Sequence, residues 1–160
     1  MTIKVGDRVP DATFMTMTAD GPQQLTSAQL FGGKKVALFA LPGAFTPTCS
    51  ARHLPGYKEK AEDFKAKGVD TIACLSVNDA FVMSAWGEDQ NVGDKVVMLA
   101  DGNAEFTKQV GLEMDGSKFG MGTRSQRYSM LVDDGVVKEL NVEQPGEFKV
   151  SAAEFMLDQL

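Results

Sequence analysis

The chain of 160 residues is poor in the residues that most often carry covalent or metal chemistry, with two cysteines, one histidine and one tryptophan. Two cysteines are too few for a disulfide scaffold, and a single histidine has no second set of ligands beside it to hold a metal ion. We therefore expect no metal and no cofactor. A reducing compartment, most simply the cytosol, fits the low cysteine content.

Long hydrophobic runs and an excess of positive charge are also missing. No apolar stretch is long enough to span a bilayer, and residues 1–14 lack the apolar core of a secretory signal. The net charge of −6 argues against binding to nucleic acid or to an anionic membrane surface. Because repeats, low-complexity tracts and linkers are absent too, we expect one domain over residues 1–160.

The most informative stretch is residues 36–50, VALFALPGAFTPTCS. It begins with six apolar residues, breaks at Pro42-Gly43 and restarts as a polar segment that contains Cys49. An apolar run, a Gly/Pro break and a polar restart are typical of a buried strand, a turn and the start of a helix.

Cys49 is expected in the first turn of that helix. Pro47 suits the first helical position because its missing N–H would be unpaired there, and Thr46 before it is a good N-cap. Backbone N–H groups and the helix dipole favour an anion at this place. The thiol is therefore expected to ionise more readily than a free one, and the thiolate is the nucleophilic form.

The remaining hydrophobic pattern alternates between strand and helix periods. Expected strands cover 12–18 (an edge strand, with 23–25 returning as a hairpin), 35–41, 69–77, 96–99, 127–132 and 136–142. Expected helical features are an amphipathic helix over 54–64 that is kinked or split at Pro55-Gly56, a helix capped by Asp79, and a C-terminal helix with a capping box at Ser151 and Glu154. Residues 114–122 are expected to form a glycine-rich loop.

This order of elements predicts an α/β protein with a thioredoxin-like fold, in which helices flank a central mixed sheet and a β-hairpin lies at the N-terminus. The usual C-x-x-C motif of that fold is incomplete here. Thr46 stands where its first cysteine would be, so a dithiol oxidoreductase is disfavoured.

The active-site region resembles that of the peroxiredoxins. Pro42, Thr46 and Cys49 match their pattern P-x-x-x-T-x-x-C. The longer strings PGAFTPTCSARHLPGY and RSQRYSMLVDDGVV resemble the type II or peroxiredoxin-five subfamily, and the likeness covers nearly the whole chain. It implies a thiol peroxidase that reduces hydrogen peroxide and organic hydroperoxides, with a role in antioxidant defence and redox homeostasis.

Peroxide reduction needs an anionic sulfur, hydrogen-bond donors and stabilisation of the charge on the leaving oxygen. Cys49 is the candidate nucleophile and would become a sulfenic acid. The Thr46 hydroxyl would bond the sulfur or the peroxide, and Pro42 would shield the sulfur from water. By the resemblance, Arg127 supplies a fixed positive charge, although an arginine on a strand is usually a solvated surface residue.

Other residues carry weaker expectations. Gly43 and Phe45 are candidates for substrate binding or for tuning the site. His53 lies four residues after Cys49, on the same helix face, and is a candidate for tuning; the alternative is simple packing. Cys74 lies within an apolar strand and is expected in the core, so it is an unlikely resolving cysteine.

One departure from the resemblance concerns the second cysteine. Two-cysteine members of the subfamily carry a resolving cysteine near the C-terminus, where this chain has Val150 and Ser151. We therefore expect a one-cysteine cycle, in which glutathione with glutaredoxin, or alternatively thioredoxin, reduces the sulfenic acid. The resemblance also implies a homodimer with Phe45 and Phe119 as candidate contacts. Two other functions stay open, a peroxide sensor or redox relay that uses the same cysteine and a non-catalytic binding module.

Overall fold

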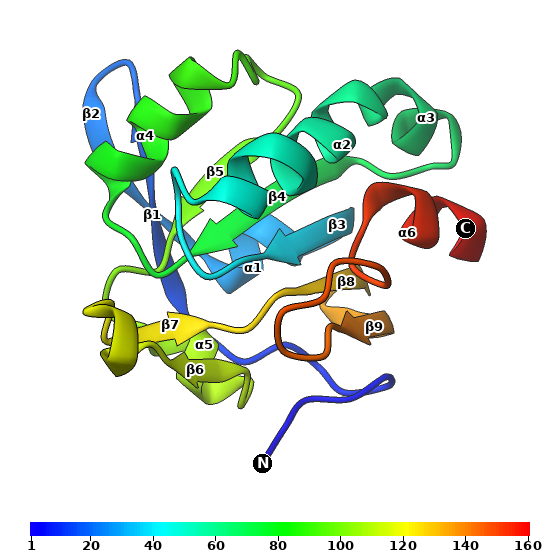
Figure 1. Cartoon of the computed structure of the whole chain (residues 1–160). Coiled ribbons are helices and arrows are strands. Elements are labelled where there is room, and N and C mark those ends of the chain that lie inside the picture. The colour runs from blue at the N-terminus through cyan, green and yellow to red at the C-terminus, as the bar shows by residue number, and fades with distance from the viewer.

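The computed structural model describes all 160 residues, and its centre is a seven-stranded sheet in the order β2-β1-β5-β4-β3-β8-β9 (Figure 1). β4 runs parallel to β3 and to β5, and the other neighbours are antiparallel. The strands are β1 (Thr13–Thr18), β2 (Gly21–Thr26), β3 (Lys35–Ala40), β4 (Thr71–Ser76), β5 (Val97–Ala100), β8 (Tyr128–Asp133) and β9 (Val136–Val142). The predicted α/β class, the mixed sheet and the N-terminal hairpin are confirmed.

Strand β3 is apolar without interruption because both of its faces are covered. Alternate side chains of a strand point to opposite faces, so Ala37 and Phe39 enter one core and Val36 and Leu38 the other. All four are fully buried. It lies inside the sheet, with parallel β4 on one side and antiparallel β8 on the other.

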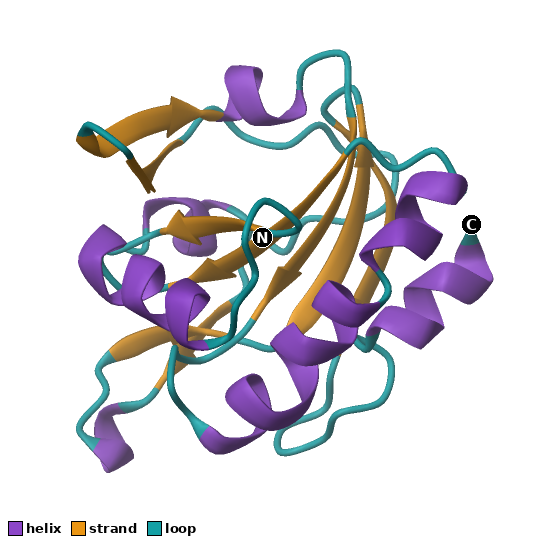
Figure 2. Ribbon diagram, turned by 90° about the horizontal axis from the view of Figure 1, so that it is seen from above, coloured by secondary structure: helices purple, strands orange, loops and turns teal.

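Helices cover both faces of the sheet (Figure 2). The helices are α1 (Ser27–Phe31), α2 (Leu54–Glu59), α3 (Ala61–Ala66), α4 (Ala80–Asp89), α5 (Glu105–Gln109) and α6 (Ala153–Gln159). Side chains of α2, α3, α4 and α6 share the core that includes Phe39 and Cys49, whereas α1 and α5 pack against the opposite face. No helix has the length and apolarity that a membrane crossing requires.

The predicted irregularity at Pro55-Gly56 is found directly before the proline. The irregularity precedes Pro55 as a π-helical turn, Cys49–His53, in which the Leu54 N–H bonds to the Cys49 carbonyl. Proline has no N–H, and its ring crowds the carbonyl four residues earlier, so a wider turn before it removes both problems. The helix then continues through Pro55 and breaks only at Lys60, between α2 and α3.

Two other expectations are corrected at the sheet edge and in the glycine-rich segment. The edge strand is β2, not β1, since β1 pairs on its other side with β5. Pro22 in β2 suits an edge because it cannot donate to a further strand. Residues 114–122 are not only a loop. They lie within a small antiparallel unit of β6 (Glu113–Asp115) and β7 (Thr123–Ser125), with a 3₁₀ turn at its tip.

The predicted capping box at Ser151 and Glu154 is also wrong. Helix α6 begins at Ala153 without a side-chain cap. The Ser151 hydroxyl donates to the Glu143 carboxylate over 2.7 Å, and Ser151 is fully buried. A buried carboxylate competes for the hydroxyl more strongly than a helix N–H does, because hydrogen bonds to charged groups are the stronger ones.

Candidate active site around Cys49

The antiparallel register between β3 and β8 brings together two candidates that lie 78 residues apart. Ala40 at the end of β3 pairs with Tyr128, so Arg127 lies beside the turn that leaves β3. Its Nη2 donates to the Cys49 sulfur over 3.1 Å. Cys49 is fully buried, so a fixed guanidinium charge faces the sulfur where little water can screen it.

The Thr46 hydroxyl does not cap the helix as predicted. It donates to the Gly43 carbonyl over 2.7 Å and accepts no backbone N–H, while the Thr46 carbonyl accepts the first helical bond from Ser50. The tight turn brings the Gly43 carbonyl within reach of the hydroxyl, and this bond uses the only hydroxyl proton. The lone pairs of the oxygen, and not its proton, are therefore left for a ligand.

Pro42 and Gly43 form the turn in front of the sulfur, and Arg124 holds this turn in place. Arg124 donates from Nη1 to the Pro42 carbonyl over 3.3 Å and from Nε to the Met121 carbonyl over 2.9 Å. A Cβ on Gly43 would lie 3.0 Å from the Arg124 Nη1. Glycine therefore lets the Arg124 side chain pack closely against this turn. The two bonds of Arg124 tie the active-site turn to the β6–β7 unit.

A hollow of about 410 Å³ opens beside these residues. Pro42, Thr48 and Arg127 line one part of it, and residues 113–114 and 143–147 line much of the rest. Small peroxides and thiols fit such a volume. Cys49 and Thr46 do not line the hollow, whereas Arg127 and half-buried Pro42 do.

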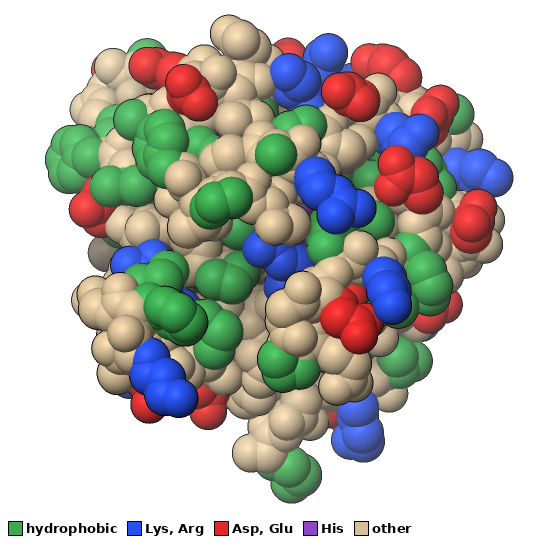
Figure 3. Space-filling model, viewed as in Figure 1, with side chains coloured by type: hydrophobic (Ala, Val, Ile, Leu, Met, Phe, Trp, Pro, Cys, Tyr) green, Lys and Arg blue, Asp and Glu red, His purple; other side chains and the backbone are tan.

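Phe45 and Phe119 lie on the surface. Their side chains are 53% and 79% exposed, and Phe81 at the start of α4 is 66% exposed. Phe45 has a φ of +63°, which is unusual for a bulky residue, and its ring centroid lies 6.5 Å from that of Trp86. Figure 3 shows hydrophobic side chains gathered over α4 and over the β6–β7 unit on the same face of the molecule.

Cys74 lies in β4 and is fully buried in the same core as Cys49. Both cysteines are free thiols. Burial raises the pKa of the Cys74 thiol well above its usual range, which favours its protonated form. The structure brings the two cysteines to one side of the sheet without joining them.

His53 contacts Arg127 directly. Its Nδ1 lies 2.8 Å from the Arg127 Nη1, and its Nε2 lies 3.1 Å from the Ser151 carbonyl. A guanidinium only donates, so Nδ1 must accept and the ring proton must be on Nε2. Burial, with a further contribution from the positive charge of Arg127, lowers the pKa of His53 to about 3, so the ring is neutral.

The lowered pKa of His53 predicts that the protein loses stability as the pH falls. The folded ring titrates at about 3 and an unfolded one near its ordinary value of 6.5, so the unfolded state binds the extra proton between these values. Between about pH 7 and about pH 5 we expect the free energy of unfolding to fall by about 2 kcal/mol. Urea unfolding at several pH values measures this change. The His53→Phe variant, which cannot titrate, should lack that part of the slope, and an unchanged slope would contradict the assignment.

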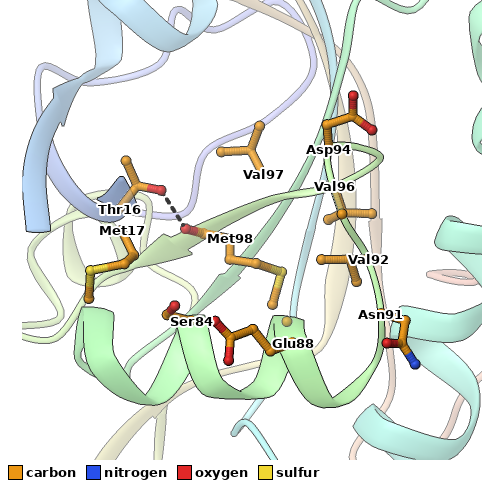
Figure 4. A pocket seen from close by; sticks show the side chains of 12 residues that line it. Thr16, Met17, Ser84, Glu88, Asn91, Val92, Asp94, Val96, Val97 and Met98 are labelled. Atoms are coloured by element: carbon orange, nitrogen blue, oxygen red, sulfur yellow. Dashed lines mark hydrogen bonds between the residues drawn. The ribbon is translucent and has the colours of Figure 1, made fainter. Parts of the chain in front are cut away.

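A larger hollow of about 680 Å³ lies away from this site, between α4 and the strands β1 and β5 (Figure 4). Thr16 of β1 donates to the Met98 carbonyl over 3.0 Å at its wall, and Ser84 and Glu88 enter from α4. None of the candidate residues lines it, and it contains no cysteine or histidine. Its size therefore says nothing about the thiol chemistry. Elsewhere, no three His, Cys, Asp or Glu side chains are grouped to hold a metal ion.

Several residues around Cys49 were not found from the sequence. Trp86 donates to the Ser50 hydroxyl over 3.0 Å, and Asn78 accepts the Ala44 N–H over 3.0 Å. Phe148 lies against Arg127, with 5.9 Å from the guanidinium carbon to the ring centroid. No local pattern marks these residues, because each contact joins segments far apart in the sequence.

Comparisons with known proteins show the family of this chain. The family model described as Redoxin matches residues 4–157. The chain is 57% identical over 164 residues to peroxiredoxin-2E-2, chloroplastic, of Oryza sativa subsp. japonica, covering 99% of this chain and 73% of that protein. It is 48% identical over 163 residues to the hybrid peroxiredoxin hyPrx5 of Haemophilus influenzae, covering 100% of this chain and 67% of that protein.

Solved structures agree as well. The crystal structure of reduced Prx3 in complex with H₂O₂ from Vibrio vulnificus has a TM-score of 0.95 and 57% sequence identity to this chain. The alignment covers 99% of both chains. This likeness confirms the thioredoxin-like form of the α/β fold.

Proposed function

Given that this chain belongs to the redoxin family and is a peroxiredoxin of the type II or peroxiredoxin-five kind, a thiol peroxidase, we propose that Cys49 is its peroxidatic nucleophile. The observation that carries the proposal is the Arg127 guanidinium, 3.1 Å from the buried Cys49 sulfur. A cation at this distance can stabilise the negative charge that moves from the sulfur to the leaving oxygen during peroxide reduction. Arg127 and Thr46 are the proposed catalytic partners, and Pro42 is the proposed shield.

The proposed reaction moves one negative charge from sulfur to oxygen. The Cys49 thiolate attacks one peroxide oxygen, an S–O bond forms and the O–O bond breaks. The other oxygen leaves as hydroxide or alkoxide and takes a proton to become water or an alcohol, while Cys49 becomes a sulfenic acid. Arg127 is placed to stabilise the charge throughout this transfer.

Thr46 and the backbone N–H of Cys49 orient the peroxide in this proposal. The Thr46 hydroxyl donates to Gly43, so its lone pairs can accept the peroxide O–H. The Cys49 N–H serves as a donor to a peroxide oxygen. Pro42 borders the hollow and has no N–H of its own, so it excludes water without offering a competing donor.

We further propose a one-cysteine cycle with an external reductant, glutathione together with glutaredoxin, and thioredoxin as the alternative. The only other cysteine, Cys74, lies in the interior of β4 with a raised pKa. Its side chain is fully buried in the core that also contains Cys49, and its strand pairs with β3 and β5. This burial supports an external donor over an internal disulfide.

The donor assay has a defined expected result. With peroxide and the purified protein, we expect sustained turnover with glutathione and glutaredoxin and a lower rate with thioredoxin. Mass spectrometry of the peroxide-treated protein should show a Cys49 sulfenic acid or its glutathione adduct. The Cys74→Ser variant should keep its turnover within about twofold, since Cys74 takes no part in the cycle.

Two other results would change this conclusion. A Cys49–Cys74 disulfide in high yield would defeat the one-cysteine cycle. A single stoichiometric oxidation of Cys49, without turnover by any donor, would favour the alternative of a peroxide sensor or redox relay, which needs the same reactive thiol.

We also propose that the chain forms a homodimer through the loops around the active site and acts in the cytosol. Exposed Phe45, Phe81 and Phe119 support an apolar contact surface, and the two free thiols support a reducing compartment. Sedimentation at micromolar concentration should give a dimer, and Phe119→Glu should weaken it. A monomer for the unmodified chain would contradict the dimer, and recovery outside the cytosolic fraction of the source cells would contradict the location.

A further inference from the structure

His53 contacts the site, and the proposed reaction gives it no part. It is fully buried, and both ring nitrogens have partners, Arg127 at Nδ1 and the Ser151 carbonyl at Nε2. The Ser151 carbonyl also accepts from the Tyr57 hydroxyl over 2.9 Å. The imidazole therefore stands between the reactive centre and a fixed backbone acceptor.

Three aromatic rings hold the imidazole in one orientation. Its centroid lies 4.9 Å from that of Phe39, 5.8 Å from that of Tyr57 and 5.0 Å from that of Phe148. With no room for water at either nitrogen, rotation of the ring would leave two buried polar atoms unpaired. The position of Nδ1 is consequently fixed.

The loop that carries Ser151 is itself anchored. The Glu143 carboxylate accepts from the Lys149 N–H over 2.6 Å and from the Ser151 N–H over 2.8 Å. The Glu143 N–H donates to the Arg127 carbonyl over 3.0 Å. The backbone of Arg127 is therefore bonded to the segment Glu143–Ser151. The Ser151 carbonyl, which accepts the bond from His53, belongs to the same segment.

A fixed acceptor matters because the guanidinium is a rigid planar fork. When Nη1 donates to the His53 Nδ1, the direction of Nη2 toward the Cys49 sulfur is set as well. No carboxylate lies within ion-pair distance of Arg127, since the two ion pairs of the chain join Lys4 to Asp7 and Lys149 to Glu147. A carboxylate in the place of His53 would orient the fork equally well but would offset its positive charge. A neutral imidazole orients it and leaves the full charge for the sulfur and the leaving oxygen.

Resting on the function proposed above, we infer that His53 is a positioning residue, a neutral acceptor that aims the Arg127 guanidinium at Cys49 and the bound peroxide without compensating its charge. Its two ring nitrogens bond to Arg127 and to the Ser151 carbonyl, and neither bonds to the Cys49 sulfur. Its effect on peroxide reduction therefore depends entirely on Arg127, so the test compares the His53 change with and without that arginine.

The test is a double-mutant cycle with His53→Phe and Arg127→Met. Phenylalanine keeps an aromatic ring of somewhat larger size against the three aromatic neighbours and removes both ring nitrogens. The rate constant for Cys49 oxidation by hydrogen peroxide is followed by the fluorescence of Trp86, the only tryptophan, which bonds to the residue next to Cys49. As a single change, we expect His53→Phe to lower this rate constant by about tenfold, as for the loss of one hydrogen bond to a charged group. In the Arg127→Met background the same change should alter it by less than about twofold.

Tyr57→Phe is the matched control, because it removes the other donor to the Ser151 carbonyl and leaves Arg127 untouched. It should lower the melting temperature without changing the rate constant. His53→Asn, whose amide oxygen can accept near the place of Nδ1, should restore part of the rate lost in His53→Phe.

Two outcomes would overturn the inference. One is a rate constant for Cys49 oxidation in His53→Phe that lies within twofold of that of the unmodified chain. The other is that His53→Phe lowers this rate constant by the same factor with Arg127 present and in the Arg127→Met background, which would indicate a merely structural role. If no variant folds, nitrogen NMR of the single histidine in the unmodified protein decides: the proton must be on Nε2 at neutral pH, and an imidazolium or an Nδ1–H ring refutes the assignment. Failure of the proposed function is separate, since it would appear as peroxide consumption that survives Cys49→Ser.

Discussion

Replacing Cys49 with serine is expected to reduce peroxide consumption to the uncatalysed background, a loss of at least about a thousandfold. Serine preserves the size of the side chain and its place at the start of the π-helical turn. Its hydroxyl remains protonated at neutral pH and is not oxidised by peroxide, so neither the nucleophile nor the sulfenic acid exists. Peroxide loss followed in a coupled assay, and by direct peroxide determination without any donor, measures the effect.

Cys74→Ser is the matched control for this change. It removes the same atom from the other cysteine of the chain, in the same core. Because serine must bury a hydroxyl in β4, we expect some loss of stability and no loss of peroxide reduction. If Cys49→Ser kept its activity while Cys74→Ser lost it, the roles assigned to the two thiols would be reversed.

Replacing Arg127 with methionine is expected to lower the rate constant for Cys49 oxidation by about 10²–10³-fold, comparable to the removal of one preorganised donor from an oxyanion site. The change deletes the bond from Nη2 to the sulfur and leaves the His53 Nδ1 without a donor. Both the thiolate and the leaving oxygen then lose their nearest positive charge. Stopped-flow oxidation by hydrogen peroxide measures the loss.

Two further variants separate charge from geometry. Arg127→Lys keeps a positive charge but not the planar fork, so it should recover only part of the rate, because lysine cannot bond His53 and the sulfur in the same fixed directions. Arg8→Met removes the same charge from an exposed arginine that contacts the β8–β9 turn, and it should leave the rate unchanged. A fall of similar size in Arg8→Met would show that net charge, and not the contact with Cys49, controls the rate.

Local pattern predicted much of this protein. The apolar run at β3, the turn at Pro42-Gly43 and the helix start before Cys49 are properties of short segments, and the structure has all three. Hydrophobic periodicity likewise predicted the strands of the central sheet and the α/β class. Such features depend on neighbours within a few residues, so the chain order contains the information needed to find them.

Expectations failed where a side chain had more than one possible partner and the folded chain decided between them. Ser151 has the sequence of a helix cap, but the Glu143 carboxylate takes its hydroxyl. Thr46 has the sequence of an N-cap, but the Gly43 carbonyl lies closer in the folded turn. The irregular helix near Pro55 was expected from the missing N–H, yet the π-helical form and its place before the proline follow from how the whole turn packs.

The residues of the active site likewise include some that local spacing associates and others that only the folded chain brings together. Cys49, Thr46 and Pro42 lie within eight consecutive residues, so their association could be read from their spacing. The meeting of Arg127 with Cys49 depends on the register of β8 against β3, and the place of His53 between Arg127 and the Ser151 carbonyl depends on the loop before α6. Directional hydrogen bonds across such separations form only when the packed sheet and helices bring their atoms within about 3 Å. Tertiary structure alone therefore decided that the single histidine, which the sequence left between packing and tuning, bonds to the arginine that faces the sulfur.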